Sequence, residues 1–158
     1  MSYAGEQALA AIRAPAGGGR AALGERLAAT PRLACAALCK ALNAADLEAA
    51  IACFSPNGCL VWEDGTLAQG EGAVRERLSE LIARAARVQI ELRGVIVAGD
   101  LALAHERWQI AYGNGVDASV TAATGPTLVL RLIADEWKIA IAAPWGAPAT
   151  EPLRAIWP

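Results

Sequence analysis

The chain has 158 residues, of which 55% are hydrophobic and 5% aromatic, and 14 Lys and Arg against 16 Asp and Glu give a formal charge of −2. This is the length of one domain that can close its own hydrophobic core. The small negative charge offers no field to attract a phosphate backbone or an acidic lipid surface, so neither nucleic acid nor a membrane is expected as a partner. No apolar run reaches the roughly 18 to 20 residues of a membrane span. The N-terminus also lacks the pattern of a signal peptide, so we expect a cytoplasmic protein.

The four cysteines are not spaced as metal ligands. Cys35 and Cys39 lie four residues apart on one face of an expected helix, and Cys53 and Cys59 flank an expected turn. Neither spacing is that of a zinc site, and the chain has one histidine. Free cysteine behaves as a small buried hydrophobe, and structural disulfides are rare in the cytosol. We expect no metal site, and no cofactor either, because no phosphate-cradling glycine loop follows a strand.

Three helices are predicted in the first half of the chain, where apolar residues recur at spacings of three and four. Their expected ranges are 31–42, 46–54 and 71–86. Thr30 can cap the first helix, and Pro31 suits its first position because the N–H that proline lacks would have no helical partner there. The residues Ser55-Pro56-Asn57-Gly58 are typical of a turn that ends the second helix. A short strand at 59–62 is expected between the second and third helices.

After Arg87 the apolar period changes to two, which is typical of strands. The expected strands cover 88–97, 101–112, 119–132 and 137–143. Turn-forming residues separate them, beginning with the hairpin signal Ala98-Gly99-Asp100, so the four strands are expected to form an antiparallel meander. Pro126 cannot donate to a strand ladder, and we expect a bulge or bend at 124–126.

Helices followed by strands indicate the α+β class, with three N-terminal helices packed on one face of a strongly curved antiparallel sheet. The hollow between a curved sheet and its helices is concave and apolar, which suits a small molecule. We expect this folded domain over residues 30–147. An Ala- and Gly-rich extension, 1–29, precedes it, and a tail, 148–158, follows it.

Several short strings, in this order, resemble the nuclear transport factor 2-like superfamily, the cystatin-like cone fold shared by SnoaL-like cyclases and ketosteroid isomerase. They are Leu42–Ala49, Gly70–Val74, Val97–Ala102, Asp135–Ile139 and Ala143–Gly146, the last being similar to an uncharacterised bacterial branch. The resemblance covers residues 31–146 and implies the fold. It does not imply one activity, because this fold hosts isomerases, cyclases, dehydratases and non-catalytic binding domains.

The resemblance also gives positions for the catalytic groups of the isomerase. Its tyrosine falls at Leu38, its base at about Trp62 and its second acid near Leu128. No Asp or Glu occurs between Asp117 and Asp135, so a carboxylic acid of that type is missing from the strand. We therefore do not expect the isomerase mechanism in its known form.

Two alternative polar faces are offered by the strand 101–112. One face carries His105 and Arg107, which could bind a carboxylate or polarise a carbonyl group. The other carries Glu106 beside Trp108, where burial would raise the pKa of the carboxyl group and make it a candidate base. Periodicity does not decide which face lines the hollow, so Glu106 and His105 are both candidate catalytic residues.

Tryptophans are numerous for a chain with so few aromatic residues. Trp62, Trp108 and Trp145 lie at strand positions that could line a pocket mouth, and with Arg107 they form the candidate ligand pocket. Large flat side chains there suit a planar, mostly apolar ligand. Packing in the core is the alternative role for each of them.

Three functions are consistent with these patterns. The first is a small-molecule-binding domain that takes an apolar or ring-containing ligand and forms a homodimer through its sheet. The second is a SnoaL-like cyclase or isomerase that uses acid–base chemistry on a carbonyl-containing ring. The third is a dimeric protein-interaction module. Enzymatic activity stays open between these hypotheses.

Overall fold

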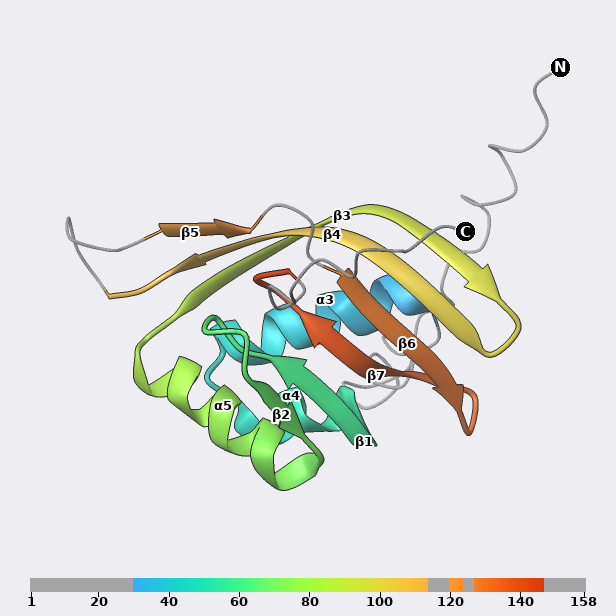
Figure 1. Cartoon of the computed structure of the whole chain (residues 1–158), viewed down its shortest axis with the longest axis horizontal. Coiled ribbons are helices and arrows are strands. Elements are labelled where there is room, and N and C mark those ends of the chain that lie inside the picture. Colours follow the sequence, from blue (N-terminus) through green and yellow to red (C-terminus); the bar gives the residue numbers. More distant parts are fainter. Residues whose placement is uncertain (1–29, 114–119, 124–126, 147–158) are drawn as a thin grey trace, which may run out of the picture.

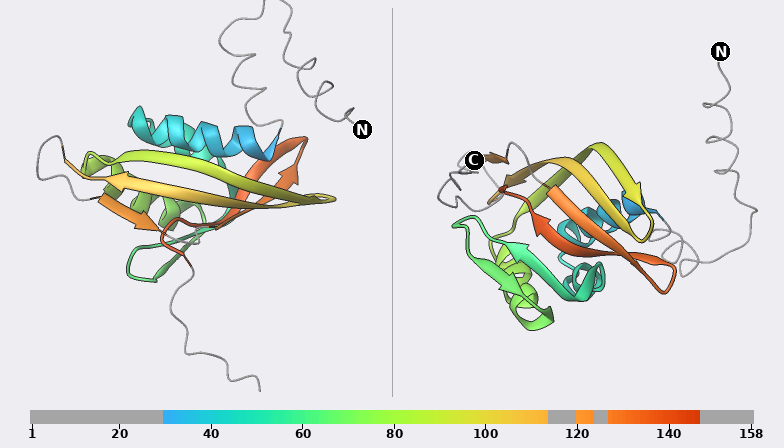
Figure 2. Two further views of the ribbon diagram at one scale, coloured as in Figure 1. Left: turned by 90° about the horizontal axis from the view of Figure 1, so that it is seen from above. Right: turned by 45° about the vertical axis from the view of Figure 1, so that its right-hand side comes forward.

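The structure, a computed structural model, describes residues 30–113, 120–123 and 127–146. Three helices lie against a mixed sheet, with α3 running alongside the long β3–β4 hairpin (Figures 1 and 2). The helices are α3 (Pro31–Asn43), α4 (Leu47–Ala52) and α5 (Glu71–Ala83). The strands are β1 (Phe54–Val61), β2 (Leu67–Gln69), β3 (Arg87–Ala98), β4 (Leu101–Ala111), β5 (Val120–Ala123), β6 (Thr127–Ile133) and β7 (Glu136–Ala143). The expected extension and tail lie outside the described residues.

The two N-terminal helices begin where local capping chemistry predicts. The Thr30 hydroxyl accepts a hydrogen bond of 3.3 Å from the Leu33 N–H, and Pro31 is the first helical residue of α3. The Asp46 carboxylate accepts one of 3.0 Å from the Ala49 N–H at the start of α4. These side chains satisfy amide groups that have no partner within the helix.

The sheet is mixed, whereas the sequence predicted an antiparallel one. Its strand order is β2-β1-β7-β6-β4-β3, and β5 also pairs with β4. The β1–β7 pair is parallel and the other pairs are antiparallel. A period of two predicts a strand but carries no information about a distant partner, and β1 and β7 are separated in the chain by all the other strands.

Residues expected as a turn form part of β1 instead. The stretch Ser55–Gly58 lies within this strand, so α4 ends earlier than expected and the short strand at 59–62 is the end of a longer one. A Cβ added to Gly58 would lie 2.9 Å from the Ile139 carbonyl oxygen of β7. Glycine therefore permits the close approach of β1 to β7, at a register irregularity between Phe54 and Cys59.

The expected strand at 119–132 is divided into β5 and β6, which pair with different parts of β4. The bulge or bend predicted at 124–126 falls outside the described residues. The hairpin predicted at 98–100 joins β3 to β4, with Gly99 at a φ of 62°. A second register irregularity, between Leu92 and Gly94 of β3, lies opposite Glu106 and His105 of β4.

One apolar core joins the helices to the sheet. Its fully buried side chains come from α3, α5 and the central strands, and they include Leu38, Leu78, Leu81, Leu130 and Ile139. The four cysteines are free thiols. None of the helices in the described part of the chain has the length and apolarity needed to cross a membrane.

Candidate functional site

Strand β4 turns its even-numbered side chains toward the helices, which decides the question that periodicity left open. Ala104, Glu106 and Trp108 are buried, with exposed fractions of 0%, 4% and 2%. His105 and Arg107 are exposed on the other face of the sheet. Because neighbouring residues of a strand point to opposite faces, Glu106 and His105 cannot contact one ligand on one face.

Glu106 is the one buried polar or charged side chain in the described ranges. The Trp108 indole Nε1 donates a hydrogen bond of 2.7 Å to its Oε2. Its Oε1 is buried without a hydrogen-bond partner from the described residues. The carboxyl group is thus held at Oε2 by Trp108, and the Cys35 thiol is its other polar neighbour.

The surroundings of Glu106 favour its neutral form. Burial raises the pKa of the carboxyl group, while contacts with the Cys35 thiol of α3 and with Trp108 act in the lowering direction. Burial also raises the pKa of the Cys35 thiol, and the neighbouring Glu106 raises it further. Burial therefore favours the neutral form of both neighbouring groups, the thiol on the helix and the carboxyl group on the sheet.

A groove of about 340 Å³ opens between α3 and β3, next to this pair. It is lined by Arg32, Cys35, Ala36, Ile90, Glu91 and Leu92. Cys35 belongs both to the wall of this α3–β3 groove and to the surroundings of Glu106. Leu92 is paired in register with Glu106, and Ile90 with Trp108. The apolar wall of the groove is therefore formed by the part of β3 that lies next to Glu106 in the sheet.

A second groove, of about 380 Å³, lies between α3, α4 and the start of β7. Its walls are mostly alanines of the two helices, and Trp137 and Cys53 also line it. Lys138 is engaged at its rim, with Glu136 at 2.7 Å and the Ala52 carbonyl at 2.9 Å. This alanine groove offers apolar surface but no buried polar group.

The three tryptophans predicted to line a pocket lie in or against the apolar core. Trp62 and Trp145 pack edge to face with ring centroids 5.0 Å apart, and the Arg77 guanidinium lies 5.1 Å from the Trp62 ring. The Trp145 Nε1 is buried without a partner from the described residues. None of Trp62, Trp108, Trp145 and Arg107 lines either groove, and their role in ligand binding stays a prediction.

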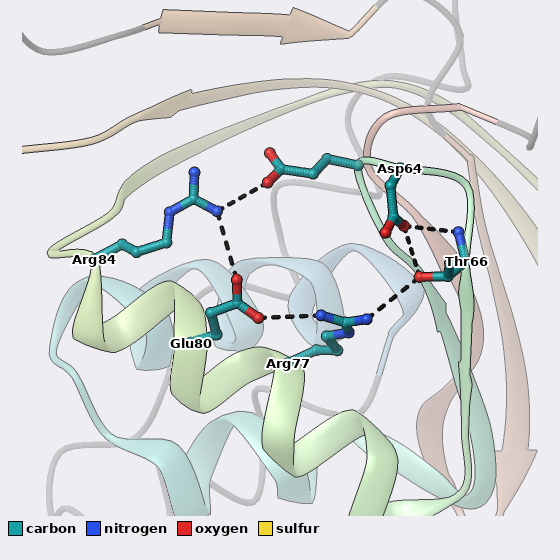
Figure 3. Close-up of polar contacts among 6 residues, drawn as sticks. Asp64, Thr66, Arg77, Glu80 and Arg84 are labelled. Carbon is teal, nitrogen blue, oxygen red and sulfur yellow. Dashed lines mark hydrogen bonds and ion pairs between the residues drawn. The ribbon is translucent and has the colours of Figure 1, made fainter.

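One ion pair and one hydrogen bond connect α5 and its C-terminal cap to the turn between β1 and β2 (Figure 3). Arg84 pairs with Glu63 at 2.9 Å, and Arg77 pairs with Glu80 at 3.1 Å. Arg77 also donates to the Thr66 hydroxyl, which in turn donates to Asp64. The arginines of this helix face are therefore already occupied by protein groups.

Sequence reasoning did not identify the contact between Cys35 and Glu106 or the groove beside them. Arg32 and Cys35 lie three residues apart, which places them on one face of α3. Nothing local in the sequence, however, indicates that this face meets the middle of β4. In the described part of the chain, no group of three or more His, Cys, Asp or Glu side chains could hold a metal ion.

Comparison with known proteins agrees with this architecture. A family model described as a SnoaL-like domain matches residues 35–139, which is more than half of the chain. The chain belongs to the SnoaL-like family. The resemblance stated from the sequence strings is confirmed, and the match begins within α3 and ends within β7. A comparison with curated proteins found no match.

Solved structures similar to this SnoaL-like domain share its fold. A ketosteroid isomerase-like protein from Erwinia carotovora atroseptica is 23% identical, with a TM-score of 0.61 over 73% of this chain and 92% of that one. A cystatin-like domain of unknown function from Nostoc punctiforme is 18% identical, with a TM-score of 0.59 over 71% and 72%. An NTF2-like protein with a cystatin-like fold from Novosphingobium aromaticivorans is 16% identical, with a TM-score of 0.57 over 70% and 75%.

Proposed function

We propose that this SnoaL-like domain binds a small, mostly apolar molecule on the helix-facing side of its sheet, with the Glu106 carboxyl group as the polar contact. The observation that carries the proposal is the unpartnered Oε1 of Glu106. Buried polar groups in proteins almost always have hydrogen-bond partners, and leaving one unsatisfied costs about 1–3 kcal/mol. A polar atom of a ligand can supply the missing partner.

The state of the carboxyl group indicates which ligand atom it would meet. Because burial raises its pKa, the neutral acid with one O–H donor is favoured. A neutral acid donates to a carbonyl or ether oxygen, so the expected ligand is an apolar or ring-containing molecule with such an acceptor. The apolar residues around Glu106, including Leu92 and Trp108, suit the rest of that molecule.

Calorimetric titration with α-tetralone, a bicyclic aryl ketone, tests this function. We expect saturable binding to the wild type and to His105→Gln, whose substitution lies on the opposite face of the same strand. Glu106→Leu, which keeps a similar volume but removes the polar group, should bind at least about tenfold more weakly, as expected for a lost buried hydrogen bond. Equal binding by the wild type and Glu106→Leu, or no binding by the wild type, would contradict the proposal.

A second candidate function is acid–base catalysis by Glu106 on the same kind of ligand. The raised pKa brings the carboxyl group closer to neutral pH, where a general base is most effective. Exchange of the α-protons of α-tetralone for deuterium, followed by NMR in heavy water, reports proton abstraction directly. Catalysis predicts acceleration by the wild type and its loss in Glu106→Gln, with binding retained because the amide can still donate. Equal exchange rates with and without protein would leave binding as the function.

We also propose that the domain forms a homodimer through the exposed face of its sheet. An apolar row crosses four neighbouring strands there, with Ile96, Leu103, Val129 and Ile141 paired in register. Ile96 and Ile141 are 60% and 41% exposed. Such a row on one face is typical of an interaction surface.

Light scattering coupled to size-exclusion chromatography tests the dimer. The wild type should have the mass of two chains, and Ile141→Glu should have that of one. Leu67→Glu is the matched control, because Leu67 is 57% exposed but lies on β2 at the sheet edge. A wild type with the mass of one chain refutes the dimer.

A further inference from the structure

The α3–β3 groove combines an apolar wall and an available cation, and its lining residue Cys35 is a neighbour of the buried Glu106 carboxyl group. Arg32 lines the groove near the start of α3, and its guanidinium makes no ion pair with another described residue. Glu91, the other charged residue of the groove, pairs with Arg93 at 3.0 Å. Of the two charged residues that line the groove, Arg32 is therefore the one available to pair with a ligand.

The spacing of these groups sets the size of a ligand. Arg32 and Cys35 are one helical turn apart, which places their Cβ atoms about 5–6 Å apart on one face of α3. Cys35 lies beside the Glu106 carboxyl group, whose Oε1 has no partner from the described residues. Ile90 and Leu92 lie on one face of β3 about 6.6 Å apart and form the apolar side of the groove.

We propose that the α3–β3 groove is the binding site, and that it takes a carbonyl compound carrying a carboxylate. The carboxylate pairs with Arg32, and the carbonyl group reaches the Glu106 carboxyl group past Cys35. This inference rests on the proposed function of Glu106 and adds the location of the site and the anionic part of the ligand.

The alanine groove is a less suitable place for such a ligand. It is slightly larger and is lined by two cations, Lys40 and Lys138, of which Lys138 is bonded to Glu136 and to a backbone carbonyl. Its Asp46 caps α4. It does not include Cys35, the residue through which the α3–β3 groove adjoins Glu106. The two grooves lie on different faces of α3, so neighbouring residues of one helix can be used to tell them apart.

Two probes that differ only in charge test the anionic part of the ligand. They are 4-oxo-4-phenylbutanoate, a keto acid, and 1-phenylbutan-1-one, the ketone without the carboxylate. Calorimetry should give the keto acid at least about tenfold tighter binding to the wild type. Arg32→Gln should remove this difference, whereas Arg131→Gln, which replaces an exposed arginine of β6 that lines neither groove, should keep it. Equal affinities for the two probes in the wild type would overturn the anionic part.

Two substitutions on α3 test the location. Ala36 is exposed and lines the α3–β3 groove, whereas Ala37 lines the alanine groove. Ala36→Phe should block both probes, and Ala37→Phe should leave both affinities unchanged. Circular dichroism and thermal unfolding confirm that each variant is folded before titration.

The outcomes separate this inference from the function on which it rests. If Ala37→Phe blocks binding and Ala36→Phe does not, the location is wrong. If a folded Ala36→Phe still binds the ketone while Glu106→Leu does not, the role of Glu106 stands and the groove is rejected. If neither probe binds the wild type, the proposed function and this inference both fail.

Discussion

The Trp108 indole donates a 2.7 Å hydrogen bond to the Glu106 carboxyl group from two residues further along β4, and both side chains are almost completely buried. Residues two apart on a strand share a face, so the strand itself brings the donor beside the acid. This short-range pair fixes one oxygen of Glu106 and leaves the other without a partner from the described residues. The site is therefore prepared for one additional polar contact.

Protonation of Glu106 should make the stability of the fold depend on pH in an unusual direction. The folded state raises the pKa of this carboxyl group above its ordinary value of about 4.3, with Cys35 and Trp108 as its polar neighbours. Folding then takes up a proton, so this contribution to stability is complete below about pH 4.3 and is lost as pH rises through the folded pKa. Between the unfolded and the folded pKa of Glu106, the free energy of unfolding falls by about 1.4 kcal/mol per pH unit. Urea unfolding of the wild type and Glu106→Gln from pH 4 to 8 should show a difference that shrinks or reverses with rising pH, and parallel curves contradict it.

Removal of the Trp108 donor should destabilise the core through the buried acid. Trp108→Phe keeps an aromatic ring but leaves both oxygens of Glu106 without a partner from the described residues, and it also opens a cavity. We expect a loss of about 2–4 kcal/mol in the free energy of unfolding. In a Glu106→Leu background the same substitution should cost about 1–3 kcal/mol less, because no acid is left unsatisfied. Equal costs in the two backgrounds would falsify a stabilising role for the hydrogen bond.

Asn43 joins the end of α3 to the start of β3. Its Nδ2 donates to the Val88 carbonyl at 2.7 Å, and its Oδ1 accepts from the Val88 N–H at 2.8 Å. Asn43→Ala should lower the free energy of unfolding by about 2–3 kcal/mol, since the Val88 N–H loses its side-chain partner and the Val88 carbonyl keeps only the weaker Cys39 thiol. Asn43→Asp keeps an acceptor for the Val88 N–H. At acidic pH its neutral carboxyl group can also donate to the Val88 carbonyl, so the cost of this substitution should be intermediate there. Chemical unfolding measures both, and a cost below about 0.5 kcal/mol for the alanine variant contradicts the bridge.

Gly58 should tolerate no side chain, in contrast to a glycine on a helix surface. In Gly58→Ala the new Cβ would lie 2.9 Å from the Ile139 carbonyl oxygen, so β1 and β7 must separate. We expect a loss of about 1–3 kcal/mol, typical of overpacking. Gly72→Ala on α5 is the matched control, because open space surrounds that position and alanine favours a helix by about 1 kcal/mol. Thermal unfolding should therefore shift in opposite directions for the two variants.

Local chemistry accounts for the parts of the fold that the sequence predicted well. The cap at Thr30 and the cap at Asp46 involve atoms three residues apart, so their pattern is visible in the chain itself. The strands β3 and β4 follow from a period of two over a long stretch. The segment Ser55–Gly58 was predicted as a turn, but it lies in β1 between Phe54 and Cys59, and both of these residues pair with β7.

At the candidate site too, the sequence determined the local arrangement and the tertiary structure decided the rest. Alternation along β4 determined from the sequence alone that Glu106 shares a face with Trp108 and that His105 shares the other with Arg107. Only the tertiary structure decided which face is buried, because that depends on which side of the sheet α3 covers. It likewise brought Cys35 and its groove to Glu106 and made β1 a parallel neighbour of β7. A sequence pattern records the period of each element, whereas contacts between distant elements are set by how their apolar faces pack together.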